Sequence, residues 1–424
     1  MPTEHSLAAG DRTSSSRPSP SSSSSPSPSP SSPSPRLRRS PVPTALLLSA
    51  VGFITLLTEV LPAGVLPAMA RDLGVSESLA GQSVAVFALG CIAAAIPLTR
   101  ATARLDRRTL VLLAITVSML ANLGTALAPE IWTHLLTRFV AGLVAGLVWA
   151  MLPGYTRGFT DPGRFGSTLG IVLSGATLGF AVGVPVGTIL SDQIGWRGVY
   201  AAISAGTLLL GLVALLIAPR VAGVRASNGS GIRTALAKRS VLVVLAAVAA
   251  SVSAQNVAYT YLAPVLTGRS PAVALSVVLG AFGVASVVGT LGAGRLANRR
   301  LGASVITALA IGATGLTAAS FAAAPWLLVL AAAAWGLAFG AYSVLFQVAV
   351  ARVGGAAADA AQSALVTVWN CSIALGGAAG GIILASWGPT LLLPTAAALT
   401  VIAIPLAVSI ASSIRANGPV SLER

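Results

Sequence analysis

The sequence has few charged residues for its length, and this shortage decides the class of protein. Of 424 residues, 9% are charged, 5% are aromatic and 55% are hydrophobic, and the mean hydropathy is +0.86. A soluble domain averages about 25% charged residues, because polar groups have to cover its folded surface. The composition therefore indicates a polytopic membrane protein. It excludes a nucleic-acid-binding protein, despite a net charge of +15, and argues against a soluble enzyme.

Cysteine and histidine are nearly absent. Cys91 and Cys371 lie in separate apolar runs, and His5 and His134 are far apart in the sequence. Metal-binding cysteines and histidines recur at short spacings, and a disulfide framework needs several cysteines. We therefore expect no metal site and no disulfide, and we expect both cysteines to fill small spaces in the apolar core.

Residues 1–40 differ in composition from the rest of the chain. They are mostly serine, proline and charged residues, and they end in Arg36-Leu37-Arg38-Arg39. Such a segment cannot bury enough apolar surface to offset the entropy lost on ordering, so a disordered tail is predicted. The segment also lacks the basic start and apolar core of a signal peptide. A phosphorylated or partner-binding tail is the alternative to an inert extension.

Twelve apolar runs are long enough to cross a bilayer, which takes about 20 helical residues. A basic polar gap separates the first six runs from the last six. The sequence therefore predicts an all-α membrane protein whose twelve transmembrane helices form two six-helix bundles. The predicted spans are 44–66, 79–98, 109–128, 131–153, 166–189, 198–218, 240–262, 272–294, 302–323, 326–350, 361–384 and 389–411.

The charges between these spans predict the orientation of the chain. If both termini are inside, nearly all of the positive charge falls on inner loops and tails, and the outer loops are close to neutral. This asymmetry is the positive-inside rule, and it makes the basic residues a sign of topology and of contact with anionic lipid. The predicted segments are a cytoplasmic tail (1–40), a first bundle (41–218), a basic cytoplasmic linker (219–239), a second bundle (240–411) and a cytoplasmic tail (412–424).

Glu59 is the only acidic residue that falls inside a predicted span. An ionisable side chain at membrane depth is costly and is a functional-site hypothesis by default. A carboxyl group there gains or loses a proton as its burial and neighbouring charges change. We expect it to couple transport to protons or to a cationic substrate. The alternative is a structural carboxyl group that bonds to backbone or to an arginine.

Arg138 is the only basic residue well inside a predicted span. The helical rise places Arg138 in the fourth span and Glu59 in the first span at a common depth, about 10 Å below the outer surface. We predict that the two are coupled, directly or through substrate or water. The alternative is an arginine whose side chain extends to the outer interface.

Glycine recurs at every fourth position in the fifth span, at Gly175, Gly179, Gly183 and Gly187, and Pro185 lies inside the run. One helical face is therefore bare, which allows close packing of a neighbouring helix. The proline removes a backbone hydrogen bond and permits a bend. The pattern predicts a packing face, and a hinge or gate is the alternative.

Several polar and aromatic side chains on the spans are candidates for lining a cavity that accepts amphipathic solutes. Gln255 and Tyr259 are four residues apart and share a helical face. Hydrogen bonding between helices is the alternative role for each residue. The candidates are Trp149, Gln255, Asn256, Tyr259, Gln347 and Asn370.

Together these motifs resemble the major facilitator superfamily over about residues 41–411. More narrowly, the chain resembles the twelve-span drug:proton antiporter and sugar-efflux branch, which includes arabinose-efflux permeases. The resemblance rests on the glycine run and on the segments 58–75, 136–142 and 195–197. In that family the arginine motif of the fourth span is linked to proton transfer, and the glycine motif of the fifth span is a signature of exporters.

The loop after the second span departs from the family pattern Gly-x-Leu-Ala-Asp-Arg-x-Gly-Arg-Arg. Ala103 stands where the family has aspartate, and Asp106 stands where it has the second glycine. The resemblance therefore implies either a lost cytoplasmic latch or one in which Asp106 replaces the aspartate. The candidate loop residues are Arg104, Asp106, Arg107 and Arg108, with Gly294 and Arg299 in the second-half copy.

These observations predict a secondary transporter, not an enzyme, that exports a small hydrophobic, amphipathic or sugar-like compound by alternating access. The expected partners are substrate, protons and lipid, without nucleic acid, and one chain is expected to suffice. No cofactor is expected, and a proton gradient is the expected energy source. The sequence lacks a Gly-x-x-x-x-Gly-Lys-Ser/Thr loop, so we do not expect an ATPase of this chain to power transport. The expected location is the inner membrane of a bacterium. An importer or uniporter on the same fold is the alternative; a membrane enzyme or sensor is more distant.

Overall fold

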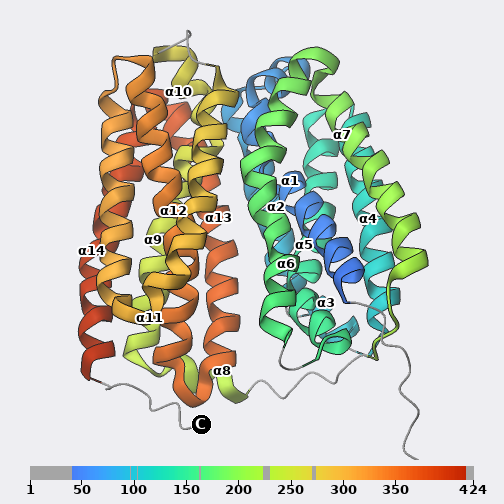
Figure 1. Ribbon diagram of the computed structural model, residues 1–424. Helices are drawn as coiled ribbons and strands as arrows, with labels where there is room; N and C mark the ends of the chain where they lie inside the picture. Colours follow the sequence, from blue (N-terminus) through green and yellow to red (C-terminus); the bar gives the residue numbers. More distant parts are fainter. Residues whose placement is uncertain are drawn as a thin grey trace, which may run out of the picture. The chain divides into compact units, whose positions relative to one another are not determined.

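The chain is described by a computed structural model and is built of helices (Figure 1). The predicted tail at 1–40 lies outside the described residues, as do parts of the predicted linker and of the C-terminal tail. The described residues are 41–95, 97–102, 104–161, 164–222, 230–269 and 274–416.

The helical segments follow one another with short connections. Two 3-10 turns and one π-helical turn interrupt or precede the long helices. The elements are α1 (Val42–Asp72), α2 (Glu77–Ala95), α3 (Pro97–Thr102), α4 (Arg107–Leu127), α5 (Ile131–Phe159), α6 (Phe165–Leu178), the π-turn η2 (Gly179–Gly183), α7 (Val184–Ile217), α8 (Ser230–Leu236), α9 (Arg239–Thr260), α10 (Leu262–Arg269), α11 (Leu275–Phe321), α12 (Pro325–Gly354), η3 (Gly355–Ala357), α13 (Ala358–Trp387), η4 (Pro389–Leu391) and α14 (Leu392–Ala416).

Eleven helical stretches in the described part of the chain are long and apolar enough to cross a membrane. The longest, 168–217, contains two spans, because Gly195 has φ 72° and ψ 159° and breaks the helix there. Glycine adopts this conformation without the strain that a Cβ atom causes. The prediction of twelve transmembrane helices is confirmed. The expected loop between spans five and six is wrong, because the single break at Gly195 takes its place. The expected loop between spans eight and nine is wrong in the same way, because α11 continues through it with a break at Arg300.

Helices of the first half pack on one another, and helices of the second half do the same, which gives the two predicted bundles (Figure 1). In the first half, α1 packs on α6 and α7, α2 on α5, and α4 on α5 and α7. In the second half, α11 packs on α12 and α14, and α9 on α13 and α14. Between the halves, α2 packs on α13, η2 and α7 on α11, and α1 on α10.

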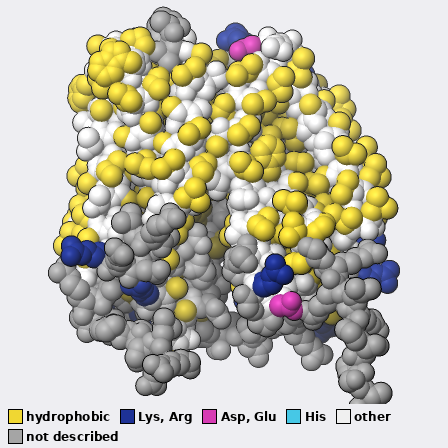
Figure 2. All heavy atoms as spheres, in the orientation of Figure 1, with side chains coloured by type: hydrophobic (Ala, Val, Ile, Leu, Met, Phe, Trp, Pro, Cys, Tyr) yellow, Lys and Arg dark blue, Asp and Glu magenta, His cyan; other side chains and the backbone are white. Residues whose placement is uncertain are grey.

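The surface of the described residues suits a lipid environment. Figure 2 shows hydrophobic side chains over the height of the visible face, with basic and acidic side chains near its two ends. Large exposed aromatic side chains lie at helix ends: Trp132 and Trp326 each occupy a second helical position, and Phe321 and Trp387 each end a helix. Aromatic residues favour this level of the bilayer, where apolar chains meet polar headgroups.

Gly175 is the clearest case of close helix approach in the fifth span. A Cβ atom at this position would overlap the carbonyl oxygen of Ser49 on α1. Gly170, on the same helix, has nothing near the place that its Cβ atom would take. The backbones of α1 and α6 are therefore close enough at Gly175 to exclude any side chain, as expected for a packing face.

This difference predicts opposite effects for one change made at two positions of α6. Gly175→Ala is expected to lower the stability by about 1–3 kcal/mol, because two backbones have to separate. Gly170→Ala is expected to leave stability unchanged or raise it slightly, since alanine favours a helix. Thermal unfolding in detergent measures both. Equal melting temperatures would contradict the close approach at Gly175.

Candidate functional site

Arg138, on α5, is fully buried and bonds to the backbone of α1. Nη1 donates to the carbonyl oxygen of Thr58 at 2.6 Å, and Nη2 donates to that of Glu59 at 3.1 Å. In a helix the Thr58 carbonyl would accept from the N–H of residue 62, which is proline and has none. Arg138 therefore supplies the donor that Pro62 removes from α1.

Glu59 is buried next to this bond, and its carboxyl group interacts with the charge of Arg138 and with the side chain of Trp149. The ring of Trp149 also lies against α1, because a Cβ atom at Gly52 would be 3.8 Å from it. The structure thus brings together Glu59, Arg138 and Trp149. The guanidinium bonds to the backbone carbonyl of Glu59, and coupling of the pair through protons stays a prediction.

Other polar side chains extend this group along α4. Thr58 Oγ1 donates to Asn122 Oδ1 at 3.2 Å, and Asn122 Nδ2 donates to the carbonyl oxygen of Ser118 at 2.9 Å. Asn122 is fully buried. A buried amide needs such partners, because leaving its donor or acceptor unpaired costs about 1–3 kcal/mol.

His134 lies one helical turn before Arg138 on α5 and is fully buried. Its Nε2 is 3.2 Å from Ser83 Oγ on α2, and its ring meets the edge of Trp196 at a centroid distance of 5.6 Å. Trp196 in turn contacts Tyr200 at 6.1 Å on α7. We call this set the Arg138 cluster: Thr58, Glu59, Ser83, Asn122, His134, Arg138, Trp149, Trp196 and Tyr200.

An ion pair adjoins the Arg138 cluster at the end of α1. Arg197 Nε and Trp196 Nε1 each lie 3.0 Å from Asp72 Oδ2. The side chains of Asp72 and Arg197 are 48% and 34% exposed, so the pair is partly in contact with solvent. The break at Gly195 sets the direction of this part of α7, which turns Trp196 inward.

The glycine run of the fifth span lies against α1 at several positions. Cβ atoms at Gly179, Gly183 and Gly187 would meet side chains of α1, so this face serves packing. Pro185 cannot donate to the carbonyl of Ala181, and the π-turn η2 lies at this point. Pro185 itself lies near Gly280 of α11. A hinge or gate role of this segment stays a prediction.

The cavity-lining candidates occupy different settings. Gln255 and Tyr259 are buried on α9, and their Oε1 and hydroxyl atoms lack partners within the described residues. Asn256 and Asn370 donate to carbonyl groups one turn back on their own helices. Gln347 is exposed and bonds in the same way. Gln255 and Tyr259 are thus buried one turn apart on α9, whereas the amides of Asn256, Gln347 and Asn370 donate within their own helices.

Tyr259 belongs to an aromatic group that joins the two halves. Phe180, in η2, meets the rings of Tyr259, Phe282 and Phe339 edge-on, at centroid distances of 5.6, 6.1 and 5.5 Å. Trp335 packs on Phe282 at 4.7 Å. Aromatic pairs of this kind add about 0.5–1.5 kcal/mol beyond the area that they bury. This group fastens the fifth span to the second bundle.

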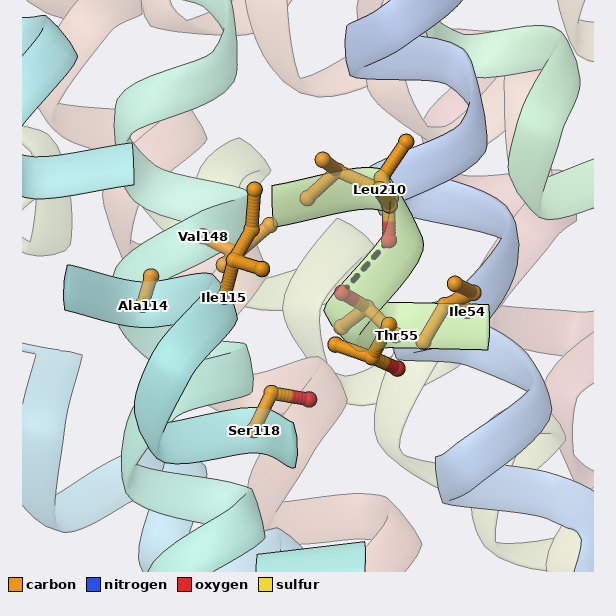
Figure 3. A pocket seen from close by; sticks show the side chains of 9 residues that line it. Ile54, Thr55, Ala114, Ile115, Ser118, Val148 and Leu210 are labelled. Atoms are coloured by element: carbon orange, nitrogen blue, oxygen red, sulfur yellow. Dashed lines mark hydrogen bonds between the residues drawn. The ribbon is translucent and has the colours of Figure 1, made fainter. Parts of the chain in front are cut away.

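Two small cavities of about 10 Å³ each lie in the first bundle, one among α1, α4, α5 and α7 and the other among α1, α2, α4 and α5. Both are lined by Thr55 and Ser118, and the second also by Thr58 and Phe87. Figure 3 shows the first, where Thr55 and Ser118 lie beside apolar side chains. Such a volume suits about one water molecule, whereas drug-sized ligands occupy pockets of about 300–1,000 Å³. These cavities are therefore not substrate sites.

The loop residues after the second span have local roles. Asp106 Oδ1 accepts from the backbone N–H groups of Arg108 and Thr109, and so caps α4. The backbone N–H of Arg107 donates to the carbonyl of Val221, and the guanidinium of Arg108 donates to that of Leu215. Arg104 is exposed. In the second-half copy, Gly294 and Arg299 lie within α11, and the surroundings of both positions are outside the described part of the structure.

A family model described as the Major Facilitator Superfamily matches residues 48–369 of the chain. The chain belongs to this superfamily. The resemblance deduced from the motifs is therefore confirmed. The protein is a membrane transporter and not an enzyme.

Curated members of the superfamily align along most of this transporter. The purine ribonucleoside efflux pump NepI of Shigella sonnei is 28% identical over 343 residues, which cover 79% of this chain and 85% of the pump. The NepI of Salmonella enteritidis is 27% identical over 78% of this chain and 84% of the pump. The MFS-type transporter YtbD of Bacillus subtilis is 27% identical over 82% and 90% of the two chains.

A solved structure shares the fold of this transporter. It is a bacterial homologue of the human lysosomal transporter Spinster in an inward-facing, unoccupied conformation. The TM-score is 0.68 at 18% identity, and the match covers 91% of this chain and 99% of the other. The inward-facing, occupied form matches with a TM-score of 0.64 at 17% identity, over 90% and 98% of the two chains. At these identities the likeness establishes the fold alone.

Sequence reasoning missed four members of the Arg138 cluster: Ser83, Asn122, His134 and Tyr200. His134 is four residues before Arg138, so helical spacing alone places both on one face. Asn122 is one of few amides at membrane depth, which is also a sequence signal. Tyr200 carries no such signal, because its position depends on the break at Gly195.

The bond between Arg138 and the Thr58 carbonyl predicts the effect of a charge-conserving change. Arg138→Lys keeps one cation but loses the planar fork, so one buried carbonyl stays unpaired, at a cost of about 1–3 kcal/mol. Thermal unfolding in detergent measures the loss. Arg157→Lys is the control, because Arg157 lies exposed on the same helix. In a Pro62→Ala background the cost of Arg138→Lys is expected to fall, since residue 62 then offers its own N–H. An undiminished cost would contradict this role of Arg138.

Proposed function

We propose that this transporter exports a small hydrophobic, amphipathic or sugar-like compound in exchange for protons, and that Glu59 is the proton-carrying group. The observation that carries the proposal is the buried Glu59 carboxyl group on α1, with Arg138 and Trp149 as its polar neighbours. A proton on Glu59 would leave Arg138 as an uncompensated positive charge. In a medium of low dielectric constant such a change alters the electrostatic energy strongly, and so can favour a different arrangement of helices.

The relatives support export and narrow the proposed substrate. NepI is named as a purine ribonucleoside efflux pump in several bacteria. A purine ribonucleoside combines a planar aromatic base with a sugar, and so falls within the amphipathic and sugar-like class. We propose Gln255 and Tyr259 as residues that face the substrate when the halves separate, because both carry buried polar atoms without partners in the described part of the chain.

We propose that the protein lies in the inner membrane of a bacterium with both termini in the cytoplasm. The support is the sidedness of charge: Arg104, Arg107 and Lys238 lie toward one side of the predicted topology, and Glu77 and Glu130 lie toward the other. We also propose the division into the segments 1–40, 41–218, 219–239, 240–411 and 412–424. One chain contains both bundles, so a monomer is proposed to suffice.

The proton-exchange mechanism predicts a loss of driven transport when Glu59 cannot ionise. The assay is uptake into proteoliposomes under an imposed pH gradient, with purine ribonucleosides, lipophilic drugs and small sugars. Glu59→Gln is expected to abolish gradient-driven movement. Glu130→Gln, an exposed acid at the start of α5, is the control and is expected to behave as wild type. Equal driven movement with Glu59→Gln would remove Glu59 from the mechanism, and movement along the proton gradient would indicate import.

The proposed orientation predicts which side of the membrane reaches two exposed positions. In a chain without Cys91 and Cys371, a cysteine at Glu130 is expected to react with an impermeant maleimide on intact cells. A cysteine at Arg104 is expected to react only after the membrane is opened. Both side chains are exposed, so access alone decides the result. The reverse labelling pattern would invert the topology.

A further inference from the structure

Three buried polar atoms in the Arg138 cluster have no hydrogen-bond partner among the described residues. They are His134 Nδ1, Arg138 Nε and the Tyr200 hydroxyl. The side chains of all three residues are fully buried. Buried polar groups are almost always paired, so three such atoms in one cluster need an explanation.

The hydrogen bonds of His134 and Ser83 determine which ring nitrogen of His134 is a donor and which is an acceptor. The Ser83 hydroxyl donates to the carbonyl oxygen of Ala80, so its oxygen accepts from His134 Nε2–H. The remaining ring nitrogen, Nδ1, is therefore an acceptor. Arg138 Nε–H is a donor, and the Tyr200 hydroxyl can do both. The set thus offers the mixed donors and acceptors that a water molecule requires.

The contacts bring these three side chains close to one another. His134 and Arg138 are one turn apart on α5, where Cβ atoms lie about 5–6 Å from each other. The ring of Trp196 contacts both His134 and Tyr200. Arg138 and Tyr200 interact electrostatically across the gap between α5 and α7.

These three side chains lie between the partly exposed Asp72–Arg197 pair and Glu59. Trp196 bonds to Asp72 on one side and packs on His134 on the other. Arg138 bonds to the carbonyl of Glu59 beyond it. A line of polar groups therefore runs from the surface at the end of α1 to Arg138, whose charge acts on the buried Glu59 carboxyl group.

The charged and titratable groups around His134 come from four helices. The charges of Arg138 and Arg197 both act on its ring. The charged and titratable groups near His134 and its neighbours are Glu59 and Asp72 from α1, Cys91 from α2, Arg138 from α5, and Arg197 and Tyr200 from α7.

We propose that His134, Arg138 and Tyr200 hold a water molecule that relays protons between the Asp72 end of the bundle and Glu59. A proton from outside water binds to the held water or to Nδ1, and a proton leaves the held water for the Glu59 carboxylate. One O–H bond forms at the carboxylate, one is lost from the entering hydronium, and the relay returns to its neutral state. This role rests on the proposed function, in which Glu59 is the proton-carrying group.

The test measures how fast Glu59 gains a proton, without any substrate. The purified chain in nanodiscs receives a pH jump, and the carboxylic-acid infrared band that Glu59→Gln removes is followed in time. His134→Gln keeps a donor for Ser83 but cannot carry the proton, and Tyr200→Phe removes the hydroxyl. Both are expected to slow protonation of Glu59 at least about tenfold, as for loss of a proton-transfer group, and to leave the midpoint of its titration unchanged. Thr125→Val, a buried hydroxyl outside the Arg138 cluster, is the control and is expected to have the wild-type rate.

Any result other than slower protonation of Glu59 with an unchanged midpoint contradicts the relay. If Glu59 titrates at the wild-type rate in both variants, the relay is wrong and the proposed function stands. If both variants move the midpoint or unfold the protein, the three residues have a structural role. If no band disappears in Glu59→Gln, Glu59 does not titrate, and both the relay and proton coupling through Glu59 fall.

Discussion

The N–H group that Pro62 lacks determines how α1 and α5 of the first bundle are joined. At membrane depth no water replaces a lost backbone hydrogen bond, so the Thr58 carbonyl needs a donor from another helix. Arg138 provides it, and α5 is thereby fixed to α1 at this level. The same guanidinium carries a full charge in an apolar interior, where an unpaired charge is costly. The Glu59 carboxyl group and the face of the Phe87 ring lie beside it and stabilise that charge.

The two bundles are joined by different means at different heights. Rings hold η2 against the second bundle, where Phe180 meets Tyr259, Phe282 and Phe339. Hydrogen bonds hold α2 against α13, where Ser78 donates to the carbonyl of Gly381. Neither contact includes a buried charge. The charged groups thus lie inside the first bundle, and the surfaces that have to separate during alternating access carry aromatic and neutral polar contacts, which are less costly to expose.

The sequence predicts the membrane spans and the main candidate site residues. The contacts between helices leave no recognisable pattern in the sequence and could not be predicted from it. Run length and charge asymmetry predicted the twelve spans, and the scarcity of intramembrane charge selected Glu59 and Arg138. The spacing of glycines in the fifth span predicted a bare face, and that face packs on α1. The bond partner of Arg138, the position of Tyr200 and the π-turn before Pro185 follow from how helices meet in space. The structure of the tail at 1–40 is not described, so its predicted disorder stays a prediction.

The position of Glu59 next to the Pro62-dependent bond gives the proposed coupling a physical route. Arg138 holds two successive carbonyl groups of α1, and the carboxyl group that would bind the proton belongs to the second of these residues. Loss of the carboxylate charge would act on the one side chain that completes the hydrogen bonding of α1. Helix α1 also packs on α9, α10 and α11 of the second bundle. A change in the bend or position of α1 at Thr58 would therefore affect both bundles directly. The Arg138 charge, 79 residues from Glu59 in sequence, acts on α1 at this point through its hydrogen bond to the Glu59 carbonyl.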